Sequence, residues 1–288
     1  MKQKIIITGI TGYIGENLAK FLMNEYDVIG IINKTNTNII TPTIKLDLKS
    51  NNYNSIKEFN PDIIIHCAAI SGLKACEENK NNAKETNVNV TRKITKLAND
   101  CSARLIFISS DQVFDGKKGM YSEGEIKNPV NYYGETKSEA EEIEKNNCLN
   151  YAVCRTALVY GGLKEKEGSF WNYLYTSLIK NKAITLYNNI FSNPTHIDEL
   201  CLMIKRLIGK KENGIFHCVG NQKLSRYEFG LKVAKKINKD SNLIKSENWI
   251  KGSQCRPKDS SLIPSSIFNG INTNNWLNNN CEVELNEN

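Results

Sequence analysis

Hydrophobic stretches alternate with amphipathic ones over the first 160 residues of the chain. The hydrophobic stretches hold few polar residues, as expected for strands of a parallel sheet that is covered by helices on both faces. They predict strands at residues 4–8, 27–32, 43–47, 62–68, 104–109 and 151–159. The amphipathic stretches predict helices at residues 13–25, 51–59, 83–100 and 132–146. This alternation is typical of an α/β fold with a doubly wound parallel sheet.

The pattern changes after Gly161 and Gly162, and from residue 264 the chain is rich in asparagine. In this second part the sequence predicts helices at residues 169–180, 197–209 and 225–238 and strands at 184–187 and 214–219. We expect a larger first domain over residues 1–160, to which residues 193–218 return, and a smaller lobe over residues 161–288.

The composition is that of a soluble globular protein, since 40% of the 288 residues are hydrophobic and 24% are charged. No apolar stretch approaches the roughly 20 residues that a membrane-spanning helix needs, and no long basic run is interspersed with aromatic residues. We therefore expect neither a membrane nor a nucleic acid as partner. The formal net charge of +7 is compatible with a cleft for a polyanionic ligand and also with an ordinary solvated surface.

Nine cysteines and three histidines are scattered along the chain, and no CxxC pair occurs. This spacing predicts no metal site. The odd number of cysteines and the lack of a secretory signal are typical of a protein of the reducing cytoplasm.

Three glycines follow the first predicted strand at the spacing G-x-x-G-x-x-G, in the segment Gly9-Ile10-Thr11-Gly12-Tyr13-Ile14-Gly15. Glycine at such positions permits an unusual turn, a close approach of the backbone to phosphate, and tight packing of a helix on a strand. The helix that follows directs its free N–H groups and the positive end of its dipole toward the phosphates. The position directly after a strand favours the phosphate-binding turn of a Rossmann-type dinucleotide site over a purely structural turn.

The end of the second predicted strand bears on the choice of cofactor. NAD sites usually carry an acid there, about 20 residues after the glycines, which binds the ribose 2′-hydroxyl. This chain has Asn33 and Lys34 instead, and the lysine either meets a 2′-phosphate or is an ordinary surface residue. The sequence therefore favours NADP, with NAD as the alternative.

Two further strand ends offer contacts for a cofactor. Asp47 ends the third predicted strand and Leu48 follows it, and the carboxylate of Asp47 either accepts a hydrogen bond from the adenine amino group or begins a turn. Ala68 and Ala69 end the fourth strand, and their small side chains would let a cofactor lie across the strand end.

Tyr133 and Lys137 lie four residues apart in a predicted helix and therefore one turn apart on the same face. An ammonium group beside a phenol favours the phenolate, so we expect the pKa of Tyr133 to fall from about 10 toward neutrality. Such a tyrosine serves as a general acid or base. Ser110 ends the fifth predicted strand, where a hydroxyl can hydrogen-bond a substrate carbonyl. With the glycine motif, these residues indicate nicotinamide-dependent redox chemistry on a carbonyl or an alcohol.

Several segments together resemble the extended short-chain dehydrogenase/reductase superfamily and, within it, most closely the dTDP-4-dehydrorhamnose reductase family. They are Ser109–Gly116, Tyr133–Lys137, Arg155–Gly161, Pro194-Thr195 with Asp198–Leu200, and Arg256–Leu262. The resemblance spans most of the chain. Gln112 and Leu158 stand where the family often has tyrosine and tryptophan, which changes the sugar-binding surface and weakens the inference to a dTDP-rhamnose substrate.

The resemblance implies roles for individual residues. Tyr133 would protonate the carbonyl oxygen, Lys137 would lower the pKa of Tyr133 and bind the nicotinamide ribose, and Ser110 would orient the carbonyl. Asn87 matches an asparagine that the superfamily uses near the cofactor, and a buried packing residue is the equal alternative.

The implied substrate is a nucleotide-linked 4-keto-6-deoxy sugar, reduced at C4 as in dTDP-rhamnose biosynthesis. The residues implied to bind it are Ser110, Asp111, Gln112, Tyr133 and Arg256, the last through substrate phosphate. The sequence is compatible with a homodimer.

Two rival functions stay open. One is a nucleotide-sugar epimerase or dehydratase of the same superfamily, although a dehydratase is expected to have a second acid where this chain has Gln112 after Asp111. The other is a non-catalytic, NADP-binding regulatory subunit like that of methionine adenosyltransferase, which resembles the same family. The intact Tyr133 and Lys137 argue against the second rival.

Overall fold

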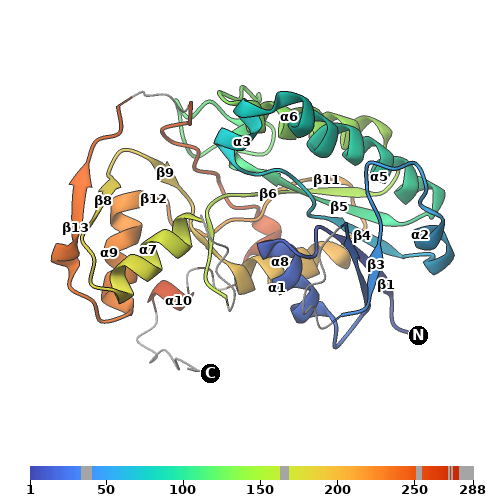
Figure 1. The fold of residues 1–288 in the computed structure, drawn as a ribbon, viewed down its shortest axis with the longest axis horizontal. Coiled ribbons are helices and arrows are strands. Elements are labelled where there is room, and N and C mark those ends of the chain that lie inside the picture. Colours follow the sequence, from blue (N-terminus) through green and yellow to red (C-terminus); the bar gives the residue numbers. More distant parts are fainter. Residues whose placement is uncertain (34–40, 163–168, 251–254, 272, 274, 279–288) are drawn as a thin grey trace.

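The computed structural model describes residues 1–33, 41–162, 169–250, 255–271, 273 and 275–278. A large lobe with the main sheet lies at the right of Figure 1, and a smaller lobe lies at the left. The described part of the chain contains no helix with the length and apolarity that a membrane crossing requires.

The large lobe is built on a seven-stranded parallel sheet with the order β11-β6-β5-β4-β1-β2-β3. Its strands are β1 (Lys4–Thr8), β2 (Asp27–Ile32), β3 (Thr43–Lys45), β4 (Ile63–His66), β5 (Arg104–Ser110), β6 (Tyr151–Thr156) and β11 (Gly214–His217). This sheet confirms the predicted α/β fold class. Because all seven strands run in the same direction, their carboxyl ends meet at one edge, where ligands bind in open parallel sheets.

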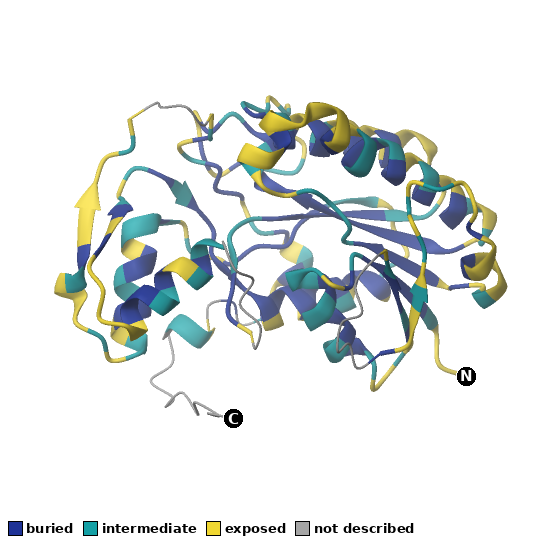
Figure 2. Cartoon of the chain, viewed as in Figure 1, coloured by how far each residue is buried: buried dark blue, intermediate teal, exposed yellow. Residues whose placement is uncertain are grey.

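Helices cover both faces of this sheet, and the central strands β1, β4, β5 and β6 between them are almost uniformly buried (Figure 2). On one face, α1 (Tyr13–Leu22) and α8 (Ile197–Ile208) pack their apolar sides against the isoleucines of β1 and β4. On the other face lie α2 (Asn54–Phe59), α5 (Val90–Asp100) and α6 (Tyr132–Asn147). The near absence of polar residues in the strands follows from this double cover.

The predicted helix over residues 83–100 is interrupted. Its elements are α4 (Lys80–Lys84), the π-helical turn η1 (Glu85–Asn89) and α5. The sequence analysis did not predict two other short elements, α3 (Leu73–Glu78) and the 3₁₀ turn η2 (Asp111–Val113). α3 and η2 lie in the connections that follow β4 and β5, at the edge where the carboxyl ends of the strands meet.

The smaller lobe packs α7 (Phe170–Ile179) and α9 (Arg226–Lys236) on a parallel pair of strands, β8 (Ile184–Tyr187) and β13 (Ile244–Glu247). Two-residue strands connect it to the large lobe: β7 (Val159–Tyr160), β9 (Phe191–Ser192), β10 (Thr195–His196) and β12 (Leu224–Ser225). The remaining short elements are η3 (Ser241–Leu243), η4 (Ser266–Phe268) and α10 (Asn275–Asn278). Since the chain passes between the lobes more than once, the domain boundary at residue 160 stays a prediction.

Candidate active site

The glycine turn joins β1 to α1. Gly9 has a φ of +67°, and a Cβ there would lie 2.7 Å from the backbone of Ala68 at the end of β4. A Cβ on Gly15 would lie 2.4 Å from the carbonyl oxygen of Gly9, so this glycine allows α1 to begin tight against the turn. Gly12 faces a cavity. The three glycines thus provide the turn, the cavity wall and the helix packing, as they do in phosphate-binding turns.

The cavity at this turn, which we call the glycine-side cavity, has a volume of about 280 Å³. It is lined by Gly9, Thr11, Gly12, Ile31, Asn33, Leu46, Asp47, Leu48, Lys49, Cys67, Ala68, Ala69, Thr86 and Val90. The residues among these that the sequence predicted for the cofactor are Gly9, Thr11, Gly12, Asn33, Asp47, Leu48, Ala68 and Ala69. Six lining residues were missed because no motif marks them, although most lie at or next to a predicted strand end: Ile31, Leu46, Lys49, Cys67, Thr86 and Val90.

Three other residues predicted to bind the cofactor are not among the described residues that line this cavity. Tyr13, Ile14 and Gly15 form the start of α1, and Ile14 packs against the core beneath it. Lys34 lies outside the described residues. Their predicted contacts with a cofactor stay predictions.

Asn87 is buried in η1, where its side-chain amide joins two segments. Its Oδ1 accepts the N–H of Ile70 at 2.8 Å, and its Nδ2 donates to the carbonyl oxygen of Ile70 at 3.0 Å. The same Nδ2 lies 3.0 Å from Oγ1 of Thr136 on α6. Asn87 therefore fixes the loop after β4 against α6, and any contact with a cofactor stays a prediction.

His66 ends β4 directly beneath the glycine turn. Its Nδ1 lies 2.7 Å from the hydroxyl of Thr8, and its Nε2 lies 3.1 Å from the hydroxyl of Thr91. Burial, and secondly the charge of Lys137, lower the pKa of His66 to about 3. His66 is therefore a neutral packing residue that holds the end of β4 in place.

Helix α6 brings Tyr133 and Lys137 to the carboxyl edge of the sheet. Asn131 caps the helix, since its Oδ1 accepts the N–H of Gly134 at 2.8 Å. Both side chains face inward, with Tyr133 9% and Lys137 3% exposed. Nζ of Lys137 donates to the carbonyl oxygen of Ile108 on β5 at 2.7 Å. One face of α6 therefore carries the predicted acid and its lysine toward the end of β5.

The electrostatics of this pair differ from the sequence prediction. Burial raises the pKa of Tyr133, and a hydrogen bond to Ser110 lowers it only in part. Burial also lowers the pKa of Lys137 to about 8. The predicted fall in the pKa of Tyr133 was wrong for the chain without bound cofactor. Burial removes water from both the phenol of Tyr133 and the ammonium group of Lys137, and the ammonium group donates to the carbonyl oxygen of Ile108. At neutral pH Tyr133 is a protonated phenol, which suits a proton donor.

Ser110, at the end of β5, lies in a cluster of polar side chains. Its hydroxyl donates to Oδ1 of Asp111 at 3.0 Å and accepts the N–H of Gln112 at 3.2 Å. Oδ1 of the buried Asp111 also accepts from Nε2 of Gln112 at 3.2 Å, and its Oδ2 accepts from Oγ of Ser260 at 2.5 Å. Burial raises the pKa of Asp111 despite these donors. The cluster thus ties β5 to a segment of the smaller lobe.

A second cavity, which we call the tyrosine-side cavity, has a volume of about 340 Å³. It is lined by Ser71, Leu73, Gln112, Tyr133, Phe170, Ile190, Phe191, Arg226, Arg256, Pro257 and Ser260. Of the predicted substrate residues, Gln112, Tyr133 and Arg256 line it. Ser110 and Asp111 are not among its lining residues.

Arg226, the first residue of α9, was not predicted for this site. Its guanidinium lies over the ring of Phe170 at 4.6 Å from the ring centre, and its Nη1 is buried without a hydrogen-bond partner among the described residues. Burial lowers the pKa of Arg226 to about 10, with Asp111 opposing and Arg256 adding to the shift. No motif marks this arginine in the sequence. Two guanidinium groups at one cavity favour an anionic group on the ligand.

Known proteins are similar to this chain in sequence and fold. A family model described as the RmlD substrate binding domain matches residues 3–279. The chain belongs to the RmlD family. It is therefore a member of the extended short-chain dehydrogenase/reductase superfamily, as the sequence predicted.

Two solved structures and one further relative are similar to this chain over most of its length. The dTDP-4-dehydrorhamnose reductase of Bacillus anthracis, solved in complex with NADP, is 26% identical with a TM-score of 0.82, covering 92% of each chain. A hypothetical dTDP-4-dehydrorhamnose reductase from Sulfolobus tokodaii is 29% identical with a TM-score of 0.83, covering 94% of this chain and 96% of that one. Methionine adenosyltransferase 2 subunit beta of Bos taurus is 30% identical over 269 residues, covering 90% of this chain and 80% of that protein.

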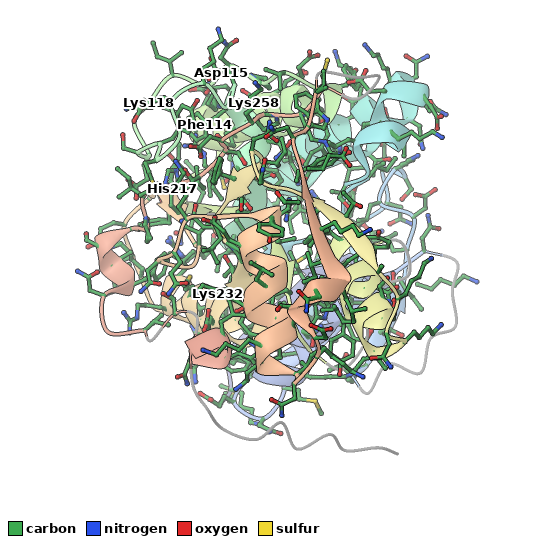
Figure 3. All side chains as sticks on the ribbon, turned by 90° about the vertical axis from the view of Figure 1, so that its left-hand side faces the viewer. Phe114, Asp115, Lys118, His217, Lys232 and Lys258 are labelled. Carbon is green, nitrogen blue, oxygen red and sulfur yellow. The ribbon has the colours of Figure 1, made fainter. Side chains whose placement is uncertain are left out.

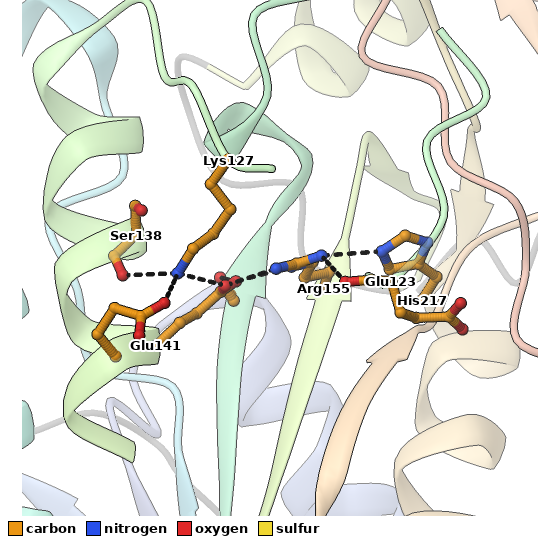
Figure 4. Close-up of polar contacts among 8 residues, drawn as sticks. Glu123, Lys127, Ser138, Glu141, Arg155 and His217 are labelled. Carbon is orange, nitrogen blue, oxygen red and sulfur yellow. Dashed lines mark hydrogen bonds and ion pairs between the residues drawn. The ribbon is translucent and has the colours of Figure 1, made fainter. Parts of the chain in front are cut away.

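In this RmlD-family chain a buried ion pair fixes α6 to the sheet (Figure 4). Nε and Nη2 of Arg155 on β6 donate to the two carboxylate oxygens of Glu141 on α6 at 2.9 and 2.8 Å. Ser109 donates to Oε1 of Glu141 at 2.5 Å, and Nζ of Lys127 lies 3.2 Å from Oε2. Burial alone would raise the pKa of Glu141, but the hydrogen bonds and charge of Arg155 hold it below its ordinary value. Glu141 lies one turn beyond Lys137 on α6. The Arg155–Glu141 ion pair therefore fixes the position of Lys137 and its face of α6 relative to the sheet.

Proposed function

We propose that the chain is a reductase that uses NADP, or alternatively NAD, to reduce the 4-keto group of a nucleotide-linked 6-deoxy sugar. The observation that carries this proposal is the position of Tyr133. Its protonated phenol lines a cavity with two guanidinium groups, close to the hydroxyl of Ser110 at the end of β5. A proton donor and an anion-binding wall at one cavity suit a phosphorylated ketone.

The fit of the cofactor is supported by the glycine-side cavity. Gly9, Gly12 and the start of α1 suit the pyrophosphate, and Asp47 and Leu48, which line the same cavity, would contact the adenine. Asn33 lines the cavity at the end of β2, where an NAD site usually has an acid. The related Bacillus anthracis reductase is in complex with NADP. When bound, this cofactor supplies the hydride.

The residues of the chain would supply the proton and hold the ketone. Tyr133 gives its phenolic proton to the carbonyl oxygen as the carbon accepts the hydride, so that the products are an alcohol and the oxidised cofactor. Ser110 hydrogen-bonds the same oxygen and stabilises the charge that develops on it. Lys137, close by on α6, holds positive charge near the phenolate that Tyr133 becomes. Water restores the proton to Tyr133 after the product leaves.

The test is a screen of NADPH and NADH oxidation, followed at 340 nm, against a panel of nucleotide-linked 4-keto sugars. Tyr133→Phe is predicted to lower kcat by at least about 10²-fold, the usual contribution of a positioned acid, while leaving the cofactor Kd unchanged. Tyr132→Phe is the matched control, since the N–H of Tyr132 donates to Glu77 and its ring lies 4.9 Å from Nζ of Lys80. A Tyr133→Phe variant with a near-normal rate would overturn the role of Tyr133.

A second candidate function is a non-catalytic regulatory subunit. It is favoured by the 30% identity to methionine adenosyltransferase 2 subunit beta over 90% of the chain. Such a subunit would bind the cofactor without oxidising it in the presence of any 4-keto sugar. It would also change the activity of a methionine adenosyltransferase catalytic subunit in a mixing experiment. Binding without turnover, together with that change, would favour this candidate over the reductase.

A further inference from the structure

Residues 47–50 form a turn directly after β3, which we call the β3 turn, and it belongs to the wall of the glycine-side cavity. The sheet gives this turn little support. β3 is the last strand in the order of the sheet, and its three residues pair with β2. Because so short a strand at the sheet edge cannot fix the turn that follows it, other contacts must set the shape of this wall.

Two side chains from neighbouring helices hold the backbone of the β3 turn. The carbonyl oxygen of Leu48 accepts a hydrogen bond from the Tyr53 hydroxyl at 2.6 Å, and Tyr53 caps the start of α2. The carbonyl oxygen of Lys49 accepts a hydrogen bond from Nζ of Lys93, on α5, at 2.6 Å. These helices and β3 lie at the same end of the large lobe (Figure 1). Both donors reach the turn from outside the cavity, since neither is among the residues that line it.

The carboxylate of Asp47 stabilises the β3 turn with one of its oxygens. Oδ1 accepts the N–H of Lys49 at 2.9 Å, and the carbonyl oxygen of Asp47 accepts the N–H of Ser50 at 2.9 Å. Asp47 therefore begins a turn, which is one of its two predicted roles. Its Oδ2 makes no hydrogen bond or ion pair with a described residue. The same carboxylate can thus hold the turn and accept a hydrogen bond from a ligand in the cavity.

The two donors are themselves held in place. Tyr53 is 8% exposed and belongs to the apolar cluster that includes Ile56 and Leu97. Nζ of Lys93 also lies 4.0 Å from the carboxylate of Glu85. The β3 turn is therefore ordered before a ligand arrives, and a preordered wall lowers the entropy cost of binding.

We propose that Tyr53 and Lys93 are positioning residues for the cofactor, which hold the β3 turn so that Asp47 accepts the amino group of the adenine. This inference rests on the cofactor site of the proposed function and concerns only the adenine end of that site. It gives the chain a means of selecting adenine over hypoxanthine. Hypoxanthine has an oxygen in place of the amino group, and this oxygen cannot donate to a carboxylate.

The experiment measures the Kd of NADPH and of its analogue with hypoxanthine in place of adenine, by calorimetric titration. The wild type should bind the analogue at least about fivefold more weakly, the effect of one lost hydrogen bond to a charged group. Tyr53→Phe should raise the NADPH Kd about 3- to 10-fold. It should also reduce the ratio of the two Kd values to less than about half the wild-type ratio, because the turn no longer directs Asp47. A general loss of structure would weaken both ligands equally and leave the ratio unchanged.

Lys93→Met tests the second contact with the turn and should change both quantities in the same direction. Its control is Lys96→Met, since Lys93 and Lys96 lie on α5 and line the same surface groove. The control removes the same charge and leaves the bond to Lys49 intact. The control for Tyr53 is Tyr151→Phe, because Tyr151 packs against the same apolar cluster. Both controls should keep the wild-type Kd for each ligand.

The possible failures are distinct. Equal binding of the two ligands by the wild type would overturn the proposal, and an unchanged ratio in either variant would overturn the role of that residue. A control that changes the ratio as much as its matched variant would count against a specific contact. A wild-type chain that binds neither NADPH nor NADH would instead contradict the cofactor site of the proposed function.

Discussion

The buried carboxyl group of Glu144 shows how one residue makes folding depend on pH. Glu144 is fully buried on α6, with Oε1 3.0 Å from the Thr95 hydroxyl and Oε2 without a hydrogen-bond partner in the part of the chain that is described. The Thr95 hydroxyl also lies 2.9 Å from the carbonyl oxygen of Thr91, and its single proton can serve only one of these acceptors. A protonated Glu144 removes the conflict by donating to Thr95. Burial accordingly raises the pKa of Glu144 to about 8.

Glu144→Gln is therefore predicted to make folding less sensitive to pH. An ordinary glutamate titrates at about 4.3, so from there to about 8 the folded chain keeps a proton that the unfolded chain has released. The wild type loses stability as pH rises through this window, whereas neutral glutamine imitates the protonated acid at every pH. The variant should match the wild type near about pH 5 and exceed it near about pH 8 by on the order of a few kcal/mol.

Urea unfolding at several pH values across this window measures the effect of Glu144→Gln. Glu139→Gln is the control, because Glu139 is exposed on the same helix and lies 4.0 Å from Lys84 at the surface. The control should retain the wild-type dependence on pH. If the Glu144→Gln variant also retains it, the buried group does not titrate as described.

At the scale of elements, helix α6 was well predicted because its signals are local. Its observed bounds, Tyr132–Asn147, nearly equal the predicted 132–146, and the Asn131 cap is readable in the sequence. The two-residue strands β7, β9, β10 and β12 could not be predicted, since each exists through pairing with a distant segment. Periodicity cannot reveal a strand of two residues, because such a strand spans only a single period of the alternation.

At the candidate site, too, residues within local sequence motifs were predicted, whereas residues placed by long-range packing were not. Gly9, Tyr133 and Arg256 belong to sequence motifs and do line cavities. Arg226 carries no motif, because its place at the cavity depends on how α9 packs. The direction of the Tyr133 pKa shift was missed for a related reason. Spacing places a lysine near a tyrosine, but burial and the partner of the ammonium group come from the packed structure.

Gly15→Ala should disrupt the start of α1. The new Cβ would lie 2.4 Å from the carbonyl oxygen of Gly9, so the turn or the helix must shift. The expected result is a lower Tm and an NADPH Kd that rises at least about tenfold, because the N–H groups at the start of α1 no longer point toward the cofactor phosphates. Gly124→Ala is the control, since a Cβ there meets nothing within 4 Å. Unchanged cofactor affinity in Gly15→Ala, measured by calorimetric titration, would show that this packing does not matter for binding.

At the scale of the whole molecule, the tyrosine-side cavity requires both lobes. Tyr133 and Gln112 come from the large lobe, whereas Arg226 and Phe170 come from the two helices of the smaller one. Contacts such as Asp111 with Ser260 join residues far apart in the sequence. The sequence analysis could name residues on each side of the cavity but could not show which of them meet.

Arg226→Gln is predicted to weaken substrate binding across this junction. The KM for the sugar nucleotide should rise by about 10- to 100-fold, as expected for a lost charge-assisted hydrogen bond, with the cofactor Kd unchanged. Lys232→Gln removes a positive charge from the same helix α9 (Figure 3) and serves as the control, since Lys232 is not among the residues that line the cavity. Equal effects of the two substitutions on KM would indicate a general electrostatic contribution and no specific contact by Arg226.

The position of β11 at the edge of the main sheet has a consequence for synthesis on the ribosome. Strands β1 to β6 are complete once Thr156 has emerged, but their neighbour β11 begins only at Gly214. At a synthesis rate of about 5–20 residues per second, the backbone groups at the outer edge of β6 stay unpaired for roughly 3–12 s before β11 is made. A nascent chain at this stage is exposed to pairing with its neighbours on a polysome, and this interval is when a chaperone would protect it most.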